Sequence, residues 1–148
     1  MKVRDVMTAT VDSIDAADTI AYAAQRMAAD DMGCMPVLRE GKLVGVVTDR
    51  DIAVRGVAAS IKPETPVSRI MSDDIATCSP GDDVQTALAL MSREQVRRMP
   101  VINERKEVIG MVAIADLAGK GPDKKAVAQA LADICEPSGL HCQVSLFA

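Results

Sequence analysis

The sequence predicts an α+β fold made of two pseudo-symmetric copies of one unit, followed by a separate C-terminal helix. Met7 and Pro36 of the 148-residue chain recur as Met71 and Pro100, 64 residues later in both cases. Each copy also contains a helical apolar pattern and then two short apolar runs separated by a polar turn. Because a unit of roughly 60 residues buries too little apolar surface to be stable alone, we expect the copies to pack together.

The first copy is placed at residues 1–62 and is predicted to run strand, helix, strand, strand, helix. Ile20, Ala23 and Met27 recur at helical spacing, and Asp18 or its neighbour is positioned to cap that helix. The next two apolar runs, on either side of a short polar turn, indicate a hairpin. The predicted elements are a lead-in strand at 10–14, a helix from about 18, strands at 35–38 and 43–47, and a helix from 49.

The second copy is placed at residues 63–122 and has the same order of elements. Gly45 and Gly110 are 65 residues apart, so one residue is inserted after Pro100, where a polar turn absorbs it at little cost. A proline-containing linker at 62–66 joins the copies, and residues 123–148 form a C-terminal helix and an irregular tail. The predicted elements are a lead-in strand at 74–78, a helix at 82–94, strands at 99–102 and 108–112, and helices from 114 and at 123–135.

The composition excludes several classes of protein. The net charge is -4 and no lysine or arginine tract is present, which argues against a nucleic-acid partner held through its phosphates. Tyr22 and Phe147 are the only aromatic residues, so stacking platforms for bases are missing as well. The sequence contains no apolar run of membrane-spanning length and no N-terminal apolar segment typical of a signal peptide. We therefore expect a cytoplasmic protein with no membrane association.

The thiols and the single histidine do not form a recognisable metal site or active site. Cys34, Cys78, Cys135 and Cys142 have no CxxC spacing, so free thiols are expected, although Cys34 lies where a redox-sensitive thiol could act. A metal site that combines His141 with neighbouring cysteines meets no ligand-spacing rule. With the histidine in the tail and no nucleophile motif, we expect no catalytic residues, no metal and no enzymatic activity.

Two matching motifs carry a resemblance to a known family. Residues 45–51 read Gly-Val-Val-Thr-Asp-Arg-Asp, residues 110–116 read Gly-Met-Val-Ala-Ile-Ala-Asp, and Met-Pro-Val precedes each hairpin. Over roughly residues 3–120, the chain resembles a tandem pair of CBS domains, known as a Bateman module. Residues 48–52 and 95–101 also resemble small stand-alone proteins of the hypoxic response protein type.

The resemblance implies a non-enzymatic sensor that requires no cofactor. Such modules bind adenosine-containing ligands, such as AMP, ADP, ATP, NAD(H) or S-adenosylmethionine, in clefts between the two repeats. They commonly form homodimers, and their ligand occupancy is read by a protein effector, which this sequence does not identify. The expected partners are therefore an adenine nucleotide, a second copy of the chain and an unknown effector protein.

The family pattern assigns roles to residues at matching positions. Asp51 matches the aspartate that binds the ribose, Thr48 matches the hydroxyl beside it, and Arg50 lies on the same helical turn, within reach of a phosphate. The second copy departs from the pattern because Ala113 replaces the hydroxyl residue. The candidate ligand-binding residues are Thr10, Val11, Asp12, Thr48, Arg50, Asp51, Ile75, Ala76, Arg97, Arg98 and Asp116.

Three interpretations of these residues remain open. Arg97 and Arg98 have no basic counterpart in the first copy, where Gly33 and Cys34 stand, so one mixed site could use groups from both copies. We expect one good site, at Thr48 and Asp51. The aspartates could instead only cap helices, and the fold could serve as a scaffold or protein-interaction module without a ligand.

Overall fold

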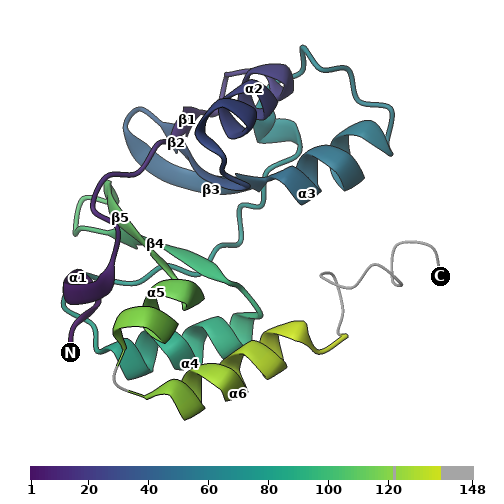
Figure 1. Ribbon diagram of the computed structural model, residues 1–148. Coiled ribbons are helices and arrows are strands. Elements are labelled where there is room, and N and C mark those ends of the chain that lie inside the picture. Colours follow the sequence, from purple (N-terminus) through teal and green to yellow (C-terminus); the bar gives the residue numbers. More distant parts are fainter. Residues whose placement is uncertain (122, 138–148) are drawn as a thin grey trace. The chain divides into compact units, whose positions relative to one another are not determined.

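A computed structural model describes residues 1–121 and 123–137 of the chain. The chain divides into two compact units, and each is described by itself (Figure 1). The first-repeat unit contains residues 10–75 and 102–109, and the second-repeat unit contains residues 1–9, 76–101, 110–121 and 123–137. The tip of the second hairpin is counted with the first-repeat unit, where the N–H of Leu43 donates to the carbonyl of Lys106 at 3.0 Å.

The first-repeat unit confirms the predicted order of strands and helices, but the lead-in strand expected at 10–14 is a two-residue strand at 14–15. The parallel pair β1–β2 and the antiparallel pair β2–β3 form a three-stranded sheet in the order β1-β2-β3. The helix expected from Asp49 is present, but after one α-helical turn it continues as a π-helix, with i→i−5 hydrogen bonds such as Ala58 N–H to Ala53 O. The elements are β1 (Ile14–Asp15), α2 (Ile20–Asp30), β2 (Cys34–Arg39), β3 (Lys42–Thr48), α3 (Asp49–Asp51), the π-helix η1 (Ile52–Val57) and the 3-10 helix η2 (Val67–Arg69).

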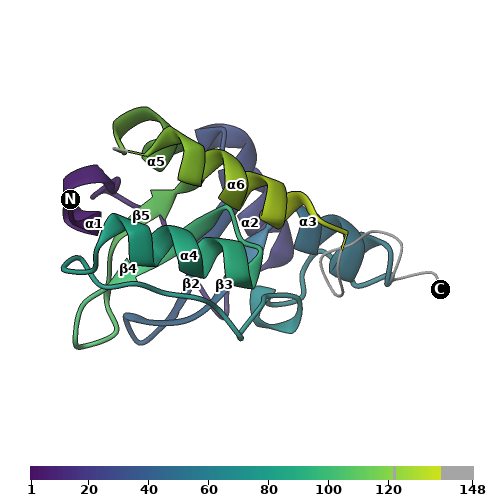
Figure 2. The ribbon, with the colours of Figure 1, turned by 90° about the horizontal axis from the view of Figure 1, so that it is seen from below.

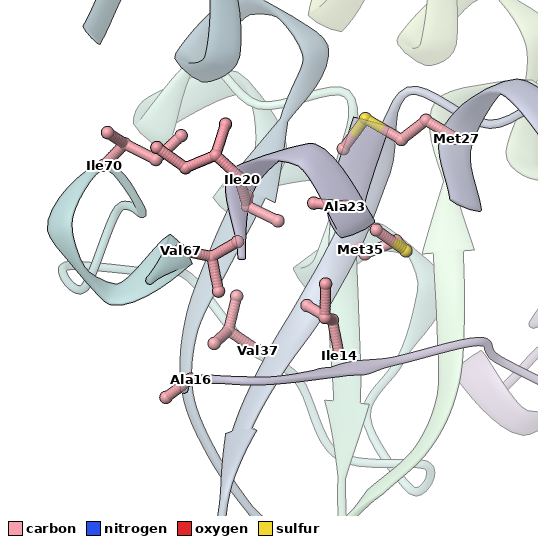
Figure 3. Close-up of a cluster of buried hydrophobic side chains, with 10 residues drawn as sticks. Ile14, Ala16, Ile20, Ala23, Met27, Met35, Val37, Val67 and Ile70 are labelled. Carbon is pink, nitrogen blue, oxygen red and sulfur yellow. The ribbon is translucent and has the colours of Figure 1, made fainter. Parts of the chain in front are cut away.

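Helix α2 supplies one side of the core of this unit. Its N-cap is Thr19, whose Oγ1 accepts a hydrogen bond from the N–H of Tyr22 at 3.0 Å. Of the apolar positions read from the sequence, Ile20, Ala23 and Met27 are buried, and Figure 3 shows them among side chains from the strands and from η2. Ala24 and Ala28 were expected on the same face but are exposed. The cluster comprises Ile14, Ala16, Ile20, Ala23, Met27, Met35, Val37, Val47, Val67 and Ile70.

The two hairpin turns differ in length, as expected from the residue inserted in the second copy. Glu40 and Gly41 form a two-residue turn in which both residues have positive φ, 53° and 77°, which suits the twist of an antiparallel hairpin. The second turn closes through a 3.1 Å hydrogen bond from Asn103 N–H to Glu107 O and has Lys106 at φ 63°. The insertion therefore lies in the turn, and the strands keep their equivalence.

The second-repeat unit repeats the pattern with a weaker lead-in. The strand expected at 74–78 is absent, and only a single parallel bridge joins Cys78 to Val101. Helix α6 lies against α4 (Figures 1 and 2), where the hydroxyl of Ser92 donates to Asp133 Oδ2 at 2.6 Å. Val127 and Ala130 of α6 are buried, whereas the side chain of Leu131 is 43% exposed. The elements are α1 (Val3–Val6), α4 (Val84–Glu94), β4 (Arg98–Ile102), β5 (Val108–Ala113), α5 (Ile114–Lys120) and α6 (Lys124–Cys135).

Each hairpin is extended by the segment that precedes the opposite repeat in the sequence. In the second-repeat unit, Thr8 and Met111 exchange two backbone hydrogen bonds of 2.9 Å. In the first-repeat unit, Ser72 and Val46 exchange an equivalent pair, also of 2.9 Å. The outer strand of each hairpin thus gains partners from sequence-distant backbone, which removes part of an exposed sheet edge.

Glycines make this close approach of the backbone possible. A Cβ atom on Gly45 would lie 2.6 Å from Met71 Sδ, and one on Gly110 would lie 2.6 Å from Met7 Sδ. Both distances are too short for any side chain larger than hydrogen without displacement of the neighbouring segment. The repeated Met and Gly positions therefore serve the same packing contact in both units.

Candidate functional site

The start of α3 brings Thr48 and Asp51 into a reciprocal pair of hydrogen bonds. The N–H of Asp51 donates to Thr48 Oγ1 at 3.1 Å, and the N–H of Thr48 donates to Asp51 Oδ2 at 2.9 Å. This is a capping box, and it forms because Thr48 leaves the strand with extended backbone while the helix begins at the next residue. Asp51 is only 9% exposed, which is unusual for a carboxylate. Capping uses Oδ2, so Oδ1 is the oxygen that can accept further hydrogen bonds.

Two arginines of the same helical segment are relevant to the site, and one of them lies near this carboxylate. Arg55 Nε lies 3.7 Å from Asp51 Oδ1. The Nη2 atom of Arg50 is buried and has no hydrogen-bond partner among the described residues. A buried guanidinium N–H without an acceptor is costly, so Arg50 is poised to bind an anionic or polar acceptor. Arg55 was not predicted from the sequence, although the cation that recurs at the equivalent Lys120 is a signal that could have identified it.

The residue before each hairpin packs against the start of the following helix. Asp49 N–H donates to the carbonyl of Gly33 at 3.0 Å, and a Cβ on Gly33 would lie 2.8 Å from Asp49 Oδ2. In the second-repeat unit, Ile114 N–H donates to the carbonyl of Arg97 at 2.9 Å. The backbone arrangement is the same, but an isoleucine at the helix start leaves room for a side chain at position 97.

The remaining candidates of the first-repeat unit lie in its loops. Thr10 and Asp12 are exposed, and Val11 and Ile75 are half-buried. Asp12 Oδ1 forms an ion pair of 3.3 Å with Arg26 Nη2 of α2. The pKa of Arg26 is raised, chiefly by its hydrogen bond to the hydroxyl of Tyr22 and then by that to Asp30. The charge of Asp12 is thus already compensated by α2.

The second-repeat unit presents an incomplete version of the same helix start. Asp116 Oδ2 accepts a hydrogen bond from Ala113 N–H at 3.0 Å, as Asp51 does from Thr48. Alanine has no side-chain acceptor, so the reciprocal bond to the N–H of Asp116 is missing. Arg97 and Arg98 are exposed. Ala76, the first residue of the segment 76–101 of this unit, is half-buried. Only one of the two helix starts therefore has both the hydroxyl and the carboxylate.

The described cysteines are in three different environments. Burial, and then a nearby negative charge, raise the pKa of Cys78 to about 11, which makes its thiol unreactive at neutral pH. Cys34 is half-buried and pairs with Thr48 across β2 and β3, whereas Cys135 is exposed. Residues 1–121 and 123–137 contain no cluster of three or more metal-ligating side chains. The tail residues of the metal site considered above, His141 and Cys142, lie outside the described part of the chain.

No helix in the described ranges combines the length and the apolar content needed to cross a bilayer. On η1, the apolar side chain of Val57 is 73% exposed. On α2, the exposed aromatic ring is that of Tyr22, at 41%. These two elements contact each other, so the first-repeat unit has exposed apolar groups on adjacent helical segments.

Comparison with known proteins identifies both repeats. The family model described as "CBS domain" matches residues 3–56 and 67–121. Hypoxic response protein 1 of Mycobacterium tuberculosis is 36% identical over 139 residues, which cover 93% of this chain and 96% of that protein. The expected likeness to proteins of that type is confirmed.

Solved structures share the fold. The crystal structure of hypoxic response protein I, which contains two coordinated zinc ions, matches with a TM-score of 0.74 and 36% identity, over 80% of this chain and 98% of that one. The CBS domain pair of protein MJ0100, solved with 5′-methylthioadenosine and S-adenosylmethionine, matches with a TM-score of 0.73 and 24% identity, over 80% and 94% of the two chains. At that identity the second match supports the fold alone.

Proposed function

The chain belongs to the CBS-domain family, and from this we propose that it is a non-enzymatic regulatory module that binds an adenosine-containing ligand at the start of α3. The ligand class we favour is a phosphate-bearing adenine nucleotide, AMP, ADP or ATP, ahead of NAD(H) and S-adenosylmethionine. Ligand occupancy would regulate a protein effector through a shift between two conformations of the module.

The observation that carries the proposal is the buried, unpartnered Nη2 of Arg50, a residue on the helical turn that Thr48 caps and that contains Asp51. A phosphate oxygen is an acceptor that would satisfy this N–H with a charge-assisted hydrogen bond. One residue further along the chain, Asp51 Oδ1 is not used for capping and can accept hydrogen bonds from ribose hydroxyls. Cation and carboxylate thus match the two polar parts of a nucleoside phosphate at adjacent positions.

The other candidates receive their roles only within this proposal. Thr48 contributes its hydroxyl beside the ribose, and the loop of Thr10, Val11 and Asp12 borders the base with its backbone and aliphatic atoms. This fits a sequence with almost no aromatic residues to stack on a purine.

The second copy is proposed as the weaker site. Asp116 retains the ribose carboxylate, Ala76 takes the place of the base loop, and Arg97 and Arg98 supply charge for phosphate. The missing hydroxyl at Ala113 removes a hydrogen bond that is typically worth about 0.5–1.5 kcal/mol.

A ligand-free scaffold or protein-interaction module is the competing function. It is favoured by the capping box itself, because Thr48 and Asp51 already satisfy each other and stabilise the helix without any ligand. Capping explains the threonine and the aspartate. It does not explain the buried, unpartnered Nη2 of Arg50.

Thermal unfolding with a ligand panel distinguishes the two functions. AMP, ATP, NADH, S-adenosylmethionine and adenosine are each added to the wild type, to Arg50→Met and to the control Arg93→Met, whose side chain is exposed. A ligand at a hundred times its dissociation constant should add about 2.7 kcal/mol of stability. We expect AMP to stabilise the wild type more than adenosine does, and Arg50→Met to abolish that difference while Arg93→Met retains it. Unchanged melting with every ligand would support the scaffold.

We propose that the module is a homodimer. The support is the resemblance together with the exposed apolar side chains of Val57 and Tyr22 on η1 and α2. Light scattering coupled to size exclusion should give twice the mass of the chain, and a monomer mass at micromolar concentration would refute the dimer.

A further inference from the structure

The side chain of Arg55 approaches a carboxylate and two backbone carbonyls of the first-repeat unit at once. From η1, its Nε lies 3.7 Å from Asp51 Oδ1. Its Nη1 donates to the carbonyl of Met71 at 3.2 Å and is 3.5 Å from the carbonyl of Ile70. One guanidinium therefore faces both the carboxylate of the proposed site and the backbone of residues 66–72, which we call the joining segment because it leads from the first repeat into the second.

The joining segment is itself built into the first-repeat unit. Val67 and Ile70 are buried in its core, and Met71 Sδ lies 2.6 Å from where a Cβ on Gly45 would be. Ser72 then pairs with β3 through two hydrogen bonds of 2.9 Å. A group that holds the carbonyls of residues 70 and 71 therefore acts on the joining segment between its buried residues and Ser72, which pairs with β3.

The second copy shows which of these contacts is common to the fold. Lys120 occupies the position of Arg55, and its Nζ donates to the carbonyl of Val6 at 3.3 Å, where Val6 is the counterpart of Ile70. In the described part of that unit, no ion pair joins Lys120 to Asp116. The contact to the backbone recurs in both copies, whereas the approach to the site carboxylate occurs only in the first.

We infer that Arg55 is a positioning residue that couples ligand binding at Asp51 to the joining segment, a role that rests on the proposed function. A ribose diol that donates to Asp51 Oδ1 restrains the carboxylate in the orientation that faces Arg55. The restrained guanidinium in turn holds the carbonyls of Ile70 and Met71. Because such coupling is reciprocal, fixing the joining segment must also strengthen ligand binding.

Arginine can perform this role and lysine cannot. The guanidinium presents donors in a rigid planar fork, so different nitrogens face the carboxylate and the carbonyls. A single ammonium reaches one of them, and Lys120 reaches the carbonyl. Arg55→Lys should therefore retain the structural anchor but lose the coupling, which separates a positioning role from a purely structural one.

The test measures backbone amide exchange with and without AMP, whose binding is first measured by calorimetry. The reporters are the amides of Val46 and Ser72, and the internal comparators are those of Thr8 and Met111, which form the equivalent pair in the other unit. The ratio of the AMP effect on the reporters to the AMP effect on the comparators removes the general stabilisation that any ligand confers. In the wild type, we expect AMP to slow the reporters about fivefold more than the comparators.

The variants give the decisive comparison. Arg55→Lys should leave exchange without AMP unchanged and reduce the AMP effect on the reporters to less than about twofold. Arg55→Met should in addition speed exchange of the reporters without ligand. Lys120→Met is the matched control and should leave the AMP effect on the reporters at its wild-type value.

Two results would overturn the inference by different routes. If AMP binds the wild type but slows reporters and comparators equally, or if Arg55→Lys keeps the full effect, Arg55 has no coupling role and the proposed function stands. If calorimetry detects no binding of AMP, the proposed function fails for this nucleotide and the inference fails with it.

Discussion

The difference between the two helix starts predicts opposite effects of exchanging their cap residues. In the first unit, Thr48 Oγ1 accepts the N–H of Asp51 at 3.1 Å, whereas Ala113 offers the N–H of Asp116 no acceptor. Losing an N-cap hydroxyl typically costs about 1 kcal/mol, within a range of about 0.5–2. Thr48→Val should therefore destabilise the chain by about 1 kcal/mol, and Ala113→Thr should stabilise it by a comparable or smaller amount.

Ala113→Val is the control that isolates the hydroxyl. Valine has the shape and β-branching of threonine but no acceptor, so the difference in free energy of unfolding between the Thr and Val variants at position 113 reports the cap alone. The assay is urea denaturation followed by circular dichroism, supported by thermal unfolding, where about 1 kcal/mol corresponds to roughly 2–4 °C. The caps share no hydrogen-bond partner, so the effects of Thr48→Val and Ala113→Thr should add. Equal stability of Ala113→Thr and Ala113→Val would refute the reasoning.

Three further outcomes follow from packing and burial. Gly45→Ala should cost about 1–3 kcal/mol in urea denaturation, because its Cβ would lie 2.8 Å from a backbone oxygen, whereas Gly81→Ala, with open space around it, should cost far less. The raised pKa of Cys78 means that the folded state keeps its proton longer than the unfolded state, so stability should fall by about 2–3 kcal/mol between pH 9 and 11, and Cys78→Ala should lose that slope. The hydrogen bond from the Ser92 hydroxyl lowers the pKa of Asp133. The attachment of α6 should therefore be intact above about pH 4 and weaken as the pH falls through the lowered pKa. Amide exchange of α6 that is equally acid-sensitive in the wild type and in Ser92→Ala would contradict this.

The parts of the fold that depend on local pattern were predictable. Apolar spacing at Ile20, Ala23 and Met27 located α2, and the polar break after Pro100 located the inserted residue in a turn. Local hydrogen bonding and face periodicity decide such features, and both are present in a short window of sequence. The pairing of Thr48 with Asp51 at a helix start is a local feature of the same kind.

The features that sequence reasoning missed depend on distant segments. The reduction of the strand expected at 74–78 to one bridge, and the pairing of Ser72 with Val46, are set by which backbone lies alongside, which periodicity does not record. The i→i−5 hydrogen bonds of η1 likewise have no residue signature. Arg55 was missed because its role is defined by carbonyl oxygens of the joining segment, and backbone acceptors are invisible in side-chain motifs.

Calorimetric titration of AMP into the wild type, Asp51→Ala and Asp116→Ala tests the central claim most directly. The two variants are matched, since each removes an equivalent capping hydrogen bond, of 2.9 Å and 3.0 Å respectively. We predict that Asp51→Ala abolishes most binding and that Asp116→Ala leaves a measurable remainder. Equal losses in the two variants, or undiminished binding by Asp51→Ala, would contradict the assignment of the principal site to the start of α3.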